Sequence, residues 1–334
     1  MNSRKRRDTA VMTRWDQTPI KKGADMGRFT EILSIILPVM LMLFIGSLAR
    51  KTRLISRAGI DALKTVAVQI GLPAVLLHTF AAAEYSLATL VVPLIMFALC
   101  TLAWFIGKRL GRALKMRSRF VPFLTTGFEA GMLGYALFTL LYGTEHLADF
   151  ARIDLGQVLF VFTLYKILLG MEGKEKPAAR QLVKEMASSP IILAILAGVL
   201  LGATGIYRAL VPSGAAGVLD ACTDFLSAPV SALILIAIGY DLVLRDLPWR
   251  EALKAAALRL VIMAVLGAVL IALFRLLWPQ ARWDKAVILM FLLPPPFVLP
   301  VFSTDEEQRV YLSSVLSLST LIALIGFVLL AVIG

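Results

Sequence analysis

Two hydrophobic stretches of this chain are interrupted by helix-breaking residues, and they lie at equivalent places in its two halves. The first stretch, 120–142, reads GFEAGMLG over 127–134, and the second, 286–302, reads PPPFVLP over 294–300. Glycine and proline at this density interrupt the helical hydrogen-bond ladder and leave main-chain N–H and C=O groups without partners. Lipid cannot satisfy such groups, so both breaks are expected to face protein or a water-filled cavity.

The composition is that of a membrane protein. Of the 334 residues, 59% are hydrophobic and 17% are charged, whereas a soluble domain carries about a quarter charged residues. A helix needs roughly 20 apolar residues to cross a hydrocarbon core of about 30 Å. Ten apolar runs approach this length: 30–49, 60–82, 87–107, 120–142, 153–171, 188–205, 216–243, 253–275, 286–302 and 309–333. We therefore expect an all-α polytopic membrane protein with ten transmembrane helices.

Basic residues gather in alternate connections between these runs. The odd-numbered connections contain seventeen Lys and Arg residues, against five in the even-numbered ones. The positive-inside rule places the basic connections in the cytoplasm, so both termini are predicted to lie outside an inner (cytoplasmic) membrane. The net charge of +12 comes from basic residues that set the orientation in the membrane and contact anionic lipid headgroups. It is therefore no sign of a nucleic-acid partner.

The N-terminal segment 1–29 does not fit this rule, because its eight basic residues should resist export. Two explanations are open. Either the native protein starts at Met26 or Met12, or an extension beginning at Met1 is translocated despite its charge. We favour Met26, because the first apolar run then follows almost at once. Residues 1–29 are predicted to be a basic extension outside the folded repeats.

Helix-breaking residues recur with a nearly constant offset. Pro38 and Pro190 are 152 residues apart, and Pro73 and Pro229 are 156 apart. Because five helices is an odd number, a second set of five must enter the membrane from the opposite side, which gives a 5+5 inverted repeat. In such a protein each repeat can adopt the conformation of the other, which gives one state open to each side of the membrane and is the physical basis of alternating access. The predicted organisation is a first repeat over 30–171, a cytoplasmic linker over 172–187 and a second repeat over 188–334.

Short motifs follow one another in a specific order along residues 30–333: Leu37-Pro38, Ile45-Gly46, Asp61-Ala62-Leu63, Leu72-Pro73, Gly131-Met132-Leu133-Gly134, Ala228-Pro229, Ile238-Gly239 and the prolines 294–296. This order resembles the auxin efflux carrier (AEC) family of permeases, relatives of the plant PIN carriers within the bile-acid-transporter-like superfamily. The resemblance implies ten helices in a scaffold domain and a transport domain, with broken fourth and ninth helices crossing near the midplane. The family's fourth helix usually reads Asn-x-Gly-x-x-Gly-x-Pro, but Glu129 and Ala136 stand at the Asn and Pro places here, so the family's substrates do not transfer directly.

Glu129 is the sharpest candidate for chemistry, because an acidic side chain at bilayer depth costs about 2.5–3.5 kcal/mol by insertion scales. Two interpretations are open. A carboxylate between a desolvating bilayer and free helix N–H groups could load and release a proton during transport. Alternatively, the side chain could be a protonated or capping group that only satisfies main-chain groups freed by the break.

The candidate substrate site comprises Thr125, Thr126, Gly127, Glu129, Gly131, Gly134, Pro294, Pro295 and Pro296. The glycines also permit close helix packing, and the threonines could bond either a substrate or their own helix backbone. A half-helix is expected to begin after the prolines and to present its positive dipole end to an anion. Lys166 is expected to snorkel to the cytoplasmic interface, and Asp241 to be a solvated cap.

These features favour a secondary active transporter that moves a small organic anion, a carboxylate, across the bilayer by elevator-like or rocking alternating access. The coupling ion is a proton, with Glu129 as its site, or sodium, and a homodimer is an option for assembly. The alternatives are a non-transporting sensor or partner subunit with a carrier-like fold, and a membrane enzyme acting on lipids. The sequence contains no Gly-Lys-Ser/Thr phosphate loop, Ser-His-Asp arrangement or paired histidines, so ATP coupling, enzymatic activity, a metal and a cofactor are not expected.

Overall fold

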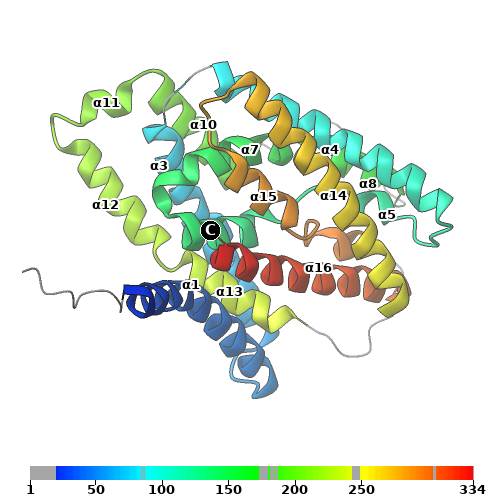
Figure 1. The fold of residues 1–334 in the computed structure, drawn as a ribbon. Coiled ribbons are helices and arrows are strands. Elements are labelled where there is room, and N and C mark those ends of the chain that lie inside the picture. Colours follow the sequence, from blue (N-terminus) through cyan, green and yellow to red (C-terminus); the bar gives the residue numbers. More distant parts are fainter. Residues whose placement is uncertain are drawn as a thin grey trace, which may run out of the picture.

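The structure of the chain is a computed structural model that describes residues 20–83, 85, 87–172, 180, 184, 187–242, 249–303 and 306–333. Within these residues every regular element is helical (Figure 1). In the part of the chain that the structure describes, seven helices are long and apolar enough to cross a membrane: Ile32–Lys51, Arg57–Ala82, Leu87–Ala113, Thr144–Met171, Ala215–Asp241, Trp249–Leu277 and Glu307–Ile333. The prediction of an all-helical polytopic membrane protein is confirmed.

The other three predicted runs contain shorter helices. Two of them are Ala130–Tyr142 and Pro190–Ala203, and the third is α15 (Asp284–Leu292). At 1.5 Å per residue, the 14 residues of Pro190–Ala203 extend about 21 Å, less than a hydrocarbon core of about 30 Å. The number of ten crossings therefore stays a prediction, although each predicted apolar run does contain a helix.

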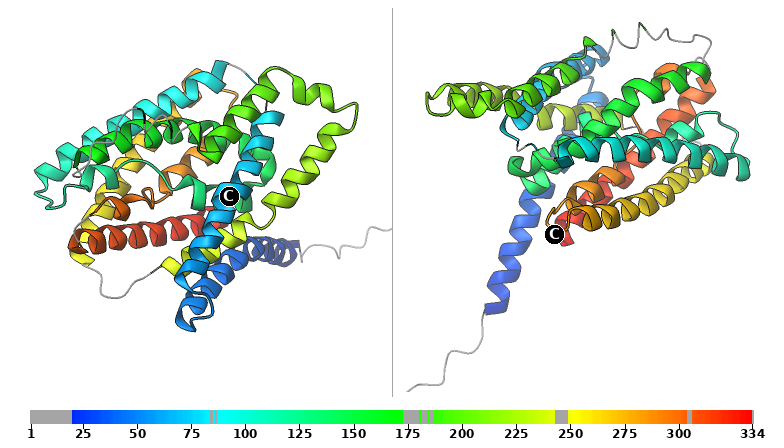
Figure 2. Two further views of the ribbon diagram at one scale, coloured as in Figure 1. Left: turned by 180° about the vertical axis from the view of Figure 1, so that it is seen from behind. Right: turned by 90° about the horizontal axis from the view of Figure 1, so that it is seen from above.

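The long helices are divided by local irregularities. The first half begins with α1 (Ile20–Lys51). Next comes α2 (Arg57–Val66), which the π-helical turn η1 (Ala67–Gly71) and α3 (Leu72–Ala82) continue, and then α4 (Leu87–Ala113). After the 3₁₀ turn η3 (Thr144–His146), α7 (Leu147–Phe160) is continued by the π-helical turn η4 (Val161–Tyr165) and α8 (Lys166–Glu172). In the second half they are α10 (Pro190–Ala203), α11 (Ile206–Leu210), α12 (Ala215–Ser227), α13 (Val230–Asp241), α14 (Trp249–Leu277) and α16 (Glu306–Ile333). The first ten residues of α1 lie in the segment predicted as an extension, and α1 projects from the rest of the described chain (Figure 2). Most of the predicted linker 172–187 and residues 1–19 lie outside the described residues.

The fourth and ninth hydrophobic segments are both interrupted, as predicted. After the short helix α5 (Val121–Leu124), the chain becomes helical again only at the π-helical turn η2 (Ala130–Gly134), which leads into α6 (Tyr135–Tyr142). After α15, residues 293–298 are not helical and are followed by the four-residue 3₁₀ turn η5 (Leu299–Phe302).

The half-helix expected after the prolines was a wrong prediction, because only this 3₁₀ turn forms. Pro300 has no N–H to donate to the Pro296 carbonyl. Leu299 N–H donates to that carbonyl instead, over 3.3 Å, and the tighter turn of a 3₁₀-helix results.

Two helix pairs pack through glycines, α1 with α13 and α3 with α10. A Cβ atom on Gly46 of α1 would overlap the carbonyl oxygen of Ile236. A Cβ atom on Gly202 of α10 would lie 2.6 Å from the Phe80 carbonyl oxygen. Small residues at such crossings let helix backbones approach closely in lipid. We call α1–α3 and α10–α13 the paired-helix group.

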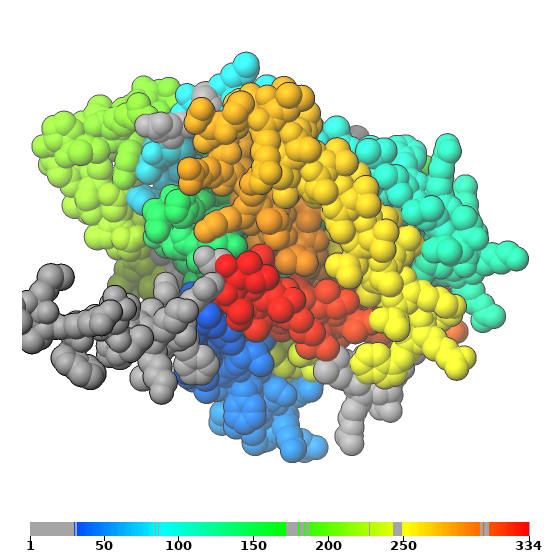
Figure 3. All heavy atoms as spheres, in the orientation of Figure 1, coloured from blue at the N-terminus to red at the C-terminus, as the bar shows by residue number. Residues whose placement is uncertain are grey.

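The remaining elements, α4–α8 and α14–α16 with both interruptions, form what we call the break group. Within it α4 packs against α7, and α14 packs against both α15 and α16. The space-filling view shows α14 and α15 beside each other on one face of the molecule (Figure 3). The short helix before the first interruption packs against α4, the helix before the second packs against α7 and α14, and the first interruption also contacts α13 of the paired-helix group.

Connections between the helices meet in two sets. Arg50 Nη1 donates to the Tyr240 carbonyl at 2.9 Å, which joins the first connection to the end of α13. Ser118 Oγ donates to Gln308 Oε1 at 2.8 Å, which joins the third connection to the start of α16. In these contacts odd-numbered connections meet odd-numbered ones.

Even-numbered connections meet in the same way. Trp283 Nε1 donates to Asp149 Oδ1 at 2.9 Å, which joins the eighth connection to the fourth. Within the sixth connection and the start of the next helix, the Tyr207 hydroxyl donates to Asp220 Oδ1 at 2.7 Å. Burial, together with the hydrogen bond and the negative charge of Asp220, raises the pKa of Tyr207 to about 12. The phenol therefore remains the donor of this bond throughout the physiological pH range.

Candidate functional site

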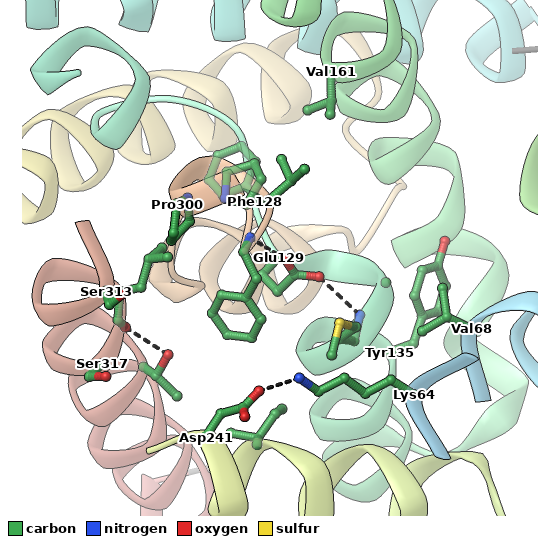
Figure 4. A pocket seen from close by; sticks show the side chains of 18 of the residues that line it. Lys64, Val68, Phe128, Glu129, Tyr135, Val161, Asp241, Pro300, Ser313 and Ser317 are labelled. Atoms are coloured by element: carbon green, nitrogen blue, oxygen red, sulfur yellow. Dashed lines mark hydrogen bonds and ion pairs between the residues drawn. The ribbon is translucent and has the colours of Figure 1, made fainter. Parts of the chain in front are cut away.

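A cavity of about 950 Å³ lies beside the two breaks. Its wall includes Glu129 and Pro296 together with side chains of α7, α13 and α16 (Figure 4). The three π-helical turns of the described chain each contribute to it, through Val68, Met132 and Phe162. Such turns are rare and often occur at functional sites, and a mostly apolar wall with a few polar groups is typical of a small-molecule pocket.

Glu129 connects the two breaks. Its main-chain N–H donates to the Pro294 carbonyl at 2.9 Å. Its carboxylate accepts hydrogen bonds from the main-chain N–H groups of Met132, at 3.3 Å, and Phe297, at 2.6 Å. The first N–H groups of a helix have no partner within the helix and favour a negative charge. One side chain thus caps both breaks while facing the cavity (Figure 4).

Arg259 of α14 connects the same two segments from their carbonyl side. Its side chain donates to the carbonyl oxygens of Leu124, Thr126 and Gly127 before and within the first break, and to that of Leu293 in the second. The residue is 4% exposed and is absent from the cavity wall. Arg259 is not among the sequence candidates, although an arginine inside the apolar run 253–275 is a recognised signal of a special site.

A second carboxylate lies in the cavity wall. Asp154 of α7 is 3% exposed and accepts hydrogen bonds from the Tyr135 hydroxyl, at 3.0 Å, and from Gln157 Nε2, at 2.8 Å. Gln157 Oε1 accepts the main-chain N–H of Phe128 at 3.3 Å, which links this network to the first break. Asp154 is also missing from the sequence candidates, and its position inside the apolar run 153–171 was the available signal.

Charged residues of the paired-helix group form one rim of the cavity. Asp241 at the end of α13 is in an ion pair with Lys64 of α2 (Figure 4). A second ion pair joins Asp241 to Arg57 over 2.6 Å. Asp241 is partly exposed, as predicted, but its carboxylate is paired with two cations from a helix distant in sequence. Sequence periodicity could not reveal this pairing across 177 residues.

Further polar side chains line the cavity from the break group. Lys166 of α8 contributes to the wall, with its Nζ atom 4.8 Å from the centre of the Phe162 ring. Arg309 lies at the start of α16, and Ser313 and Ser317 follow along the same helix (Figure 4). The cavity thus offers basic groups and hydroxyls together with apolar surface.

The two threonines of the candidate site bond main chain. The Thr125 hydroxyl donates to carbonyls of its own helix, at 3.0 Å from Pro122 O, and the Thr126 hydroxyl donates to Cys100 O on α4 at 2.6 Å. Both residues are fully buried and neither lines the cavity. In this structure they support the local backbone of the break.

The glycines and prolines of the candidate site divide in two groups. Gly127 adopts a φ of +66°, a conformation for which glycine is the favoured residue, and it packs against the ring of Pro296. Of the nine predicted residues, the cavity wall contains Glu129, Gly131 and Pro296, whereas Thr125, Thr126, Gly127, Gly134, Pro294 and Pro295 shape the breaks behind it.

A helical membrane protein with two interrupted segments that meet beside a mostly apolar cavity with a few charged and polar groups belongs to the class of membrane transporters. Residues 31–331 match the family described as Membrane transport protein (Mem_trans). The chain belongs to this family, the auxin efflux carrier (AEC) family, as the sequence motifs predicted. A comparison with curated proteins found no match. The family is one of transporters and not of enzymes, which agrees with the expected function.

Proposed function

We propose that this chain is a secondary active transporter that moves a small organic anion, a carboxylate, across the cytoplasmic membrane, with Glu129 as the site of proton coupling. The observation that carries the proposal is that Glu129 caps both breaks and also lines the cavity. A proton on this carboxylate removes the charge that holds the two N–H groups. Protonation and the geometry of the cavity wall are therefore linked through one side chain.

The charges of the cavity wall support an anionic solute. The charged lining residues are Arg57, Lys64, Lys166 and Arg309 on the basic side and Glu129, Asp154 and Asp241 on the acidic side. With all of them ionised, the wall carries one excess positive charge, which a monocarboxylate balances. If Glu129 takes up a proton, the excess becomes two, which a dicarboxylate balances. Neutral pairing matters here because an unpaired charge in a low-dielectric site is costly.

Helix packing supports the proposed 5+5 inverted repeat, with repeats over 30–171 and 188–334 and the linker 172–187 between them. If the first helix corresponds to the sixth and the second to the seventh, the pair α1 with α13 should correspond to the pair α10 with α3. Both pairs occur, and each is held by glycines of its first or sixth helix. Exchange of the two repeats would then convert an inward-open cavity into an outward-open one.

The hydrogen bonds described above support an elevator-like movement. The pairs of Arg50 with Tyr240 and of Lys64 with Asp241 lie within the paired-helix group. The bonds of Glu129 and Arg259 lie within the break group. Since each of these bonds stays inside one group, the break group can be displaced against the paired-helix group without breaking any of them.

The rim of the cavity defines the side from which we propose the solute enters. Arg57 and Asp241 adjoin odd-numbered connections, which are the basic ones, so the cavity faces the cytoplasm under the positive-inside rule. A cysteine introduced at Ser213, in an even-numbered connection, should react with an impermeant maleimide applied outside. A cysteine at Thr52, in the first connection, should react only after permeabilisation. The reverse pattern would contradict the orientation and the prediction that both termini are outside.

Counterflow in proteoliposomes tests the proposed function directly. Proteoliposomes that contain the purified protein and are preloaded with an unlabelled carboxylate should accumulate the same carboxylate in labelled form. A panel of mono- and dicarboxylates then identifies the class of solute. Saturable binding without exchange would contradict a carrier and favour a sensor with a carrier-like fold. Exchange that requires sodium but is unaffected by pH would contradict proton coupling through Glu129.

A further inference from the structure

The carbonyl oxygens freed by the two breaks converge on one point. Arg259 Nη1 lies 3.0 Å from Leu124 O, while Nη2 lies 2.7 Å from Gly127 O and 2.8 Å from Leu293 O. Leu124 is the last residue of α5, and Leu293 directly follows α15. Both helices therefore direct their carboxyl-terminal ends, where the last carbonyls lack helical partners, at the same guanidinium.

This cluster has the chemistry of a cation site. Carbonyl oxygens and helix carboxyl-terminal ends attract positive charge, and a guanidinium with five N–H donors in a planar fork can serve several acceptors at once. The ring of Phe128 adds a further cation contact, 5.4 Å from the guanidinium carbon. Among the described residues, no carboxylate forms an ion pair with Arg259, so carbonyl oxygens and one aromatic ring surround the charge.

We infer that the two breaks build a main-chain cation site that Arg259 fills permanently, so that no exchangeable metal cation binds at this crossing. Arg259 acts as a positioning residue: it holds the carbonyl side of both breaks while Glu129 holds their N–H side. Because the guanidinium is tethered to α14 and does not reach the cavity wall, it stays in place in the wild-type protein and does not exchange with the solute or with dissolved cations. The cation that fixes the crossing therefore travels with the break group.

Chemical rescue tests the inference. In Arg259→Ala the carbonyl cluster is retained and its cation is removed, so the melting temperature should fall. Guanidinium at millimolar concentration, far below the molar denaturing range, should restore part of the loss, about 3 °C at ten times its Kd. Tetramethylammonium, which has no N–H donors, should not. Met263→Ala, which removes a buried side chain one turn further along α14, should show no gain from guanidinium.

A second pair of variants covers the case in which Arg259→Ala does not fold. Arg259→Lys retains the charge, whereas Arg259→Gln retains hydrogen-bond donors without it. We expect the lysine variant to melt between wild type and the glutamine variant. An equal or higher melting temperature for Arg259→Gln would overturn the inference, and so would equal gains from guanidinium in Arg259→Ala and Met263→Ala. Neither readout depends on flux, so failure here is distinguishable from failure of the proposed transport function.

Discussion

Replacing Glu129 by glutamine removes the charge from the crossing while retaining size. The carboxylate accepts two main-chain N–H groups, at 2.6 Å from Phe297 and 3.3 Å from Met132. Hydrogen bonds to a charged group contribute about 1.5–3 kcal/mol each, against about 0.5–1.5 kcal/mol for neutral pairs. The glutamine oxygen can retain the shorter bond, but its NH₂ group then faces the Met132 N–H, and two donors cannot bond. We therefore expect a loss of about 1–3 kcal/mol, and a melting temperature lower by about 2–6 °C.

The functional effect should be larger than this loss of stability. Exchange of a labelled carboxylate by the wild-type protein in proteoliposomes should vary with pH, because the charge on Glu129 changes the balance of the cavity wall. In Glu129→Gln the exchange should persist but become independent of pH, and uptake driven by a proton gradient should stop. Glu251→Gln is the matched control, because Glu251 is a partly exposed carboxylate at the start of α14 paired with Lys254. A Glu129→Gln profile that follows the wild-type pH dependence would refute the assignment.

Three further substitutions test separate parts of the structure. Asp241→Asn should lower the free energy of unfolding by less than about 1 kcal/mol, since the ion pairs of Asp241 are partly solvated. It should tighten the binding of an anion several-fold at low salt, measured by competition, because Lys64 and Arg57 are then free to attract the anion. Unchanged binding would show that these rim cations do not reach the solute. Gly46→Val should lower the melting temperature steeply, because its Cβ would overlap the Ile236 carbonyl and cost about 1–3 kcal/mol or more of stability. The control Gly217→Ala has open space around it and should be neutral or stabilising. Equal losses in the two variants would argue against the close packing of α1 on α13. Asp154→Asn should lower the melting temperature by about 2–6 °C, because one of its two donors loses its acceptor, and calorimetry that finds no shift would contradict a structural role.

The sequence predicts the breaks well because their cause is local. Gly127 requires a positive φ, and three successive prolines cannot donate main-chain hydrogen bonds, so each interruption is visible in a few neighbouring residues. The same applies to the glycines, which indicate close helix crossings without naming the partner. The local sequence thus shows where the helical hydrogen bonds are interrupted, and it implies that other groups must bond the main-chain atoms left without partners.

The compensating groups could not be predicted in the same way, because they come from distant parts of the chain. Arg259 reaches Leu124 across 135 residues, and Glu129 reaches Phe297 across 168. The pairing of Asp241 with Lys64 is equally remote. The π-helical turns also escape a reading based on a period of 3.6, since each inserts a residue without changing the apolar character of its helix. Charged residues inside apolar runs are the one local signal, and besides Glu129, Lys166 and Asp241 it also marks Asp154 and Arg259.

The two charges at the crossing differ in what can reach them, and this difference assigns their roles. Arg259 is 4% exposed and lies behind the breaks, out of contact with the cavity, so its charge is constant while the solute changes. Glu129 satisfies the opposite polarity of the same main chain, but it lines the cavity and can exchange a proton with whatever water or solute enters. Arg259 keeps the carbonyl groups of both breaks bonded while the bonds of Glu129 to the N–H groups can change. The two breaks can therefore respond to a proton without unfolding. These differences are the basis on which we propose that Arg259 keeps the two breaks rigid and that Glu129 couples transport to a proton.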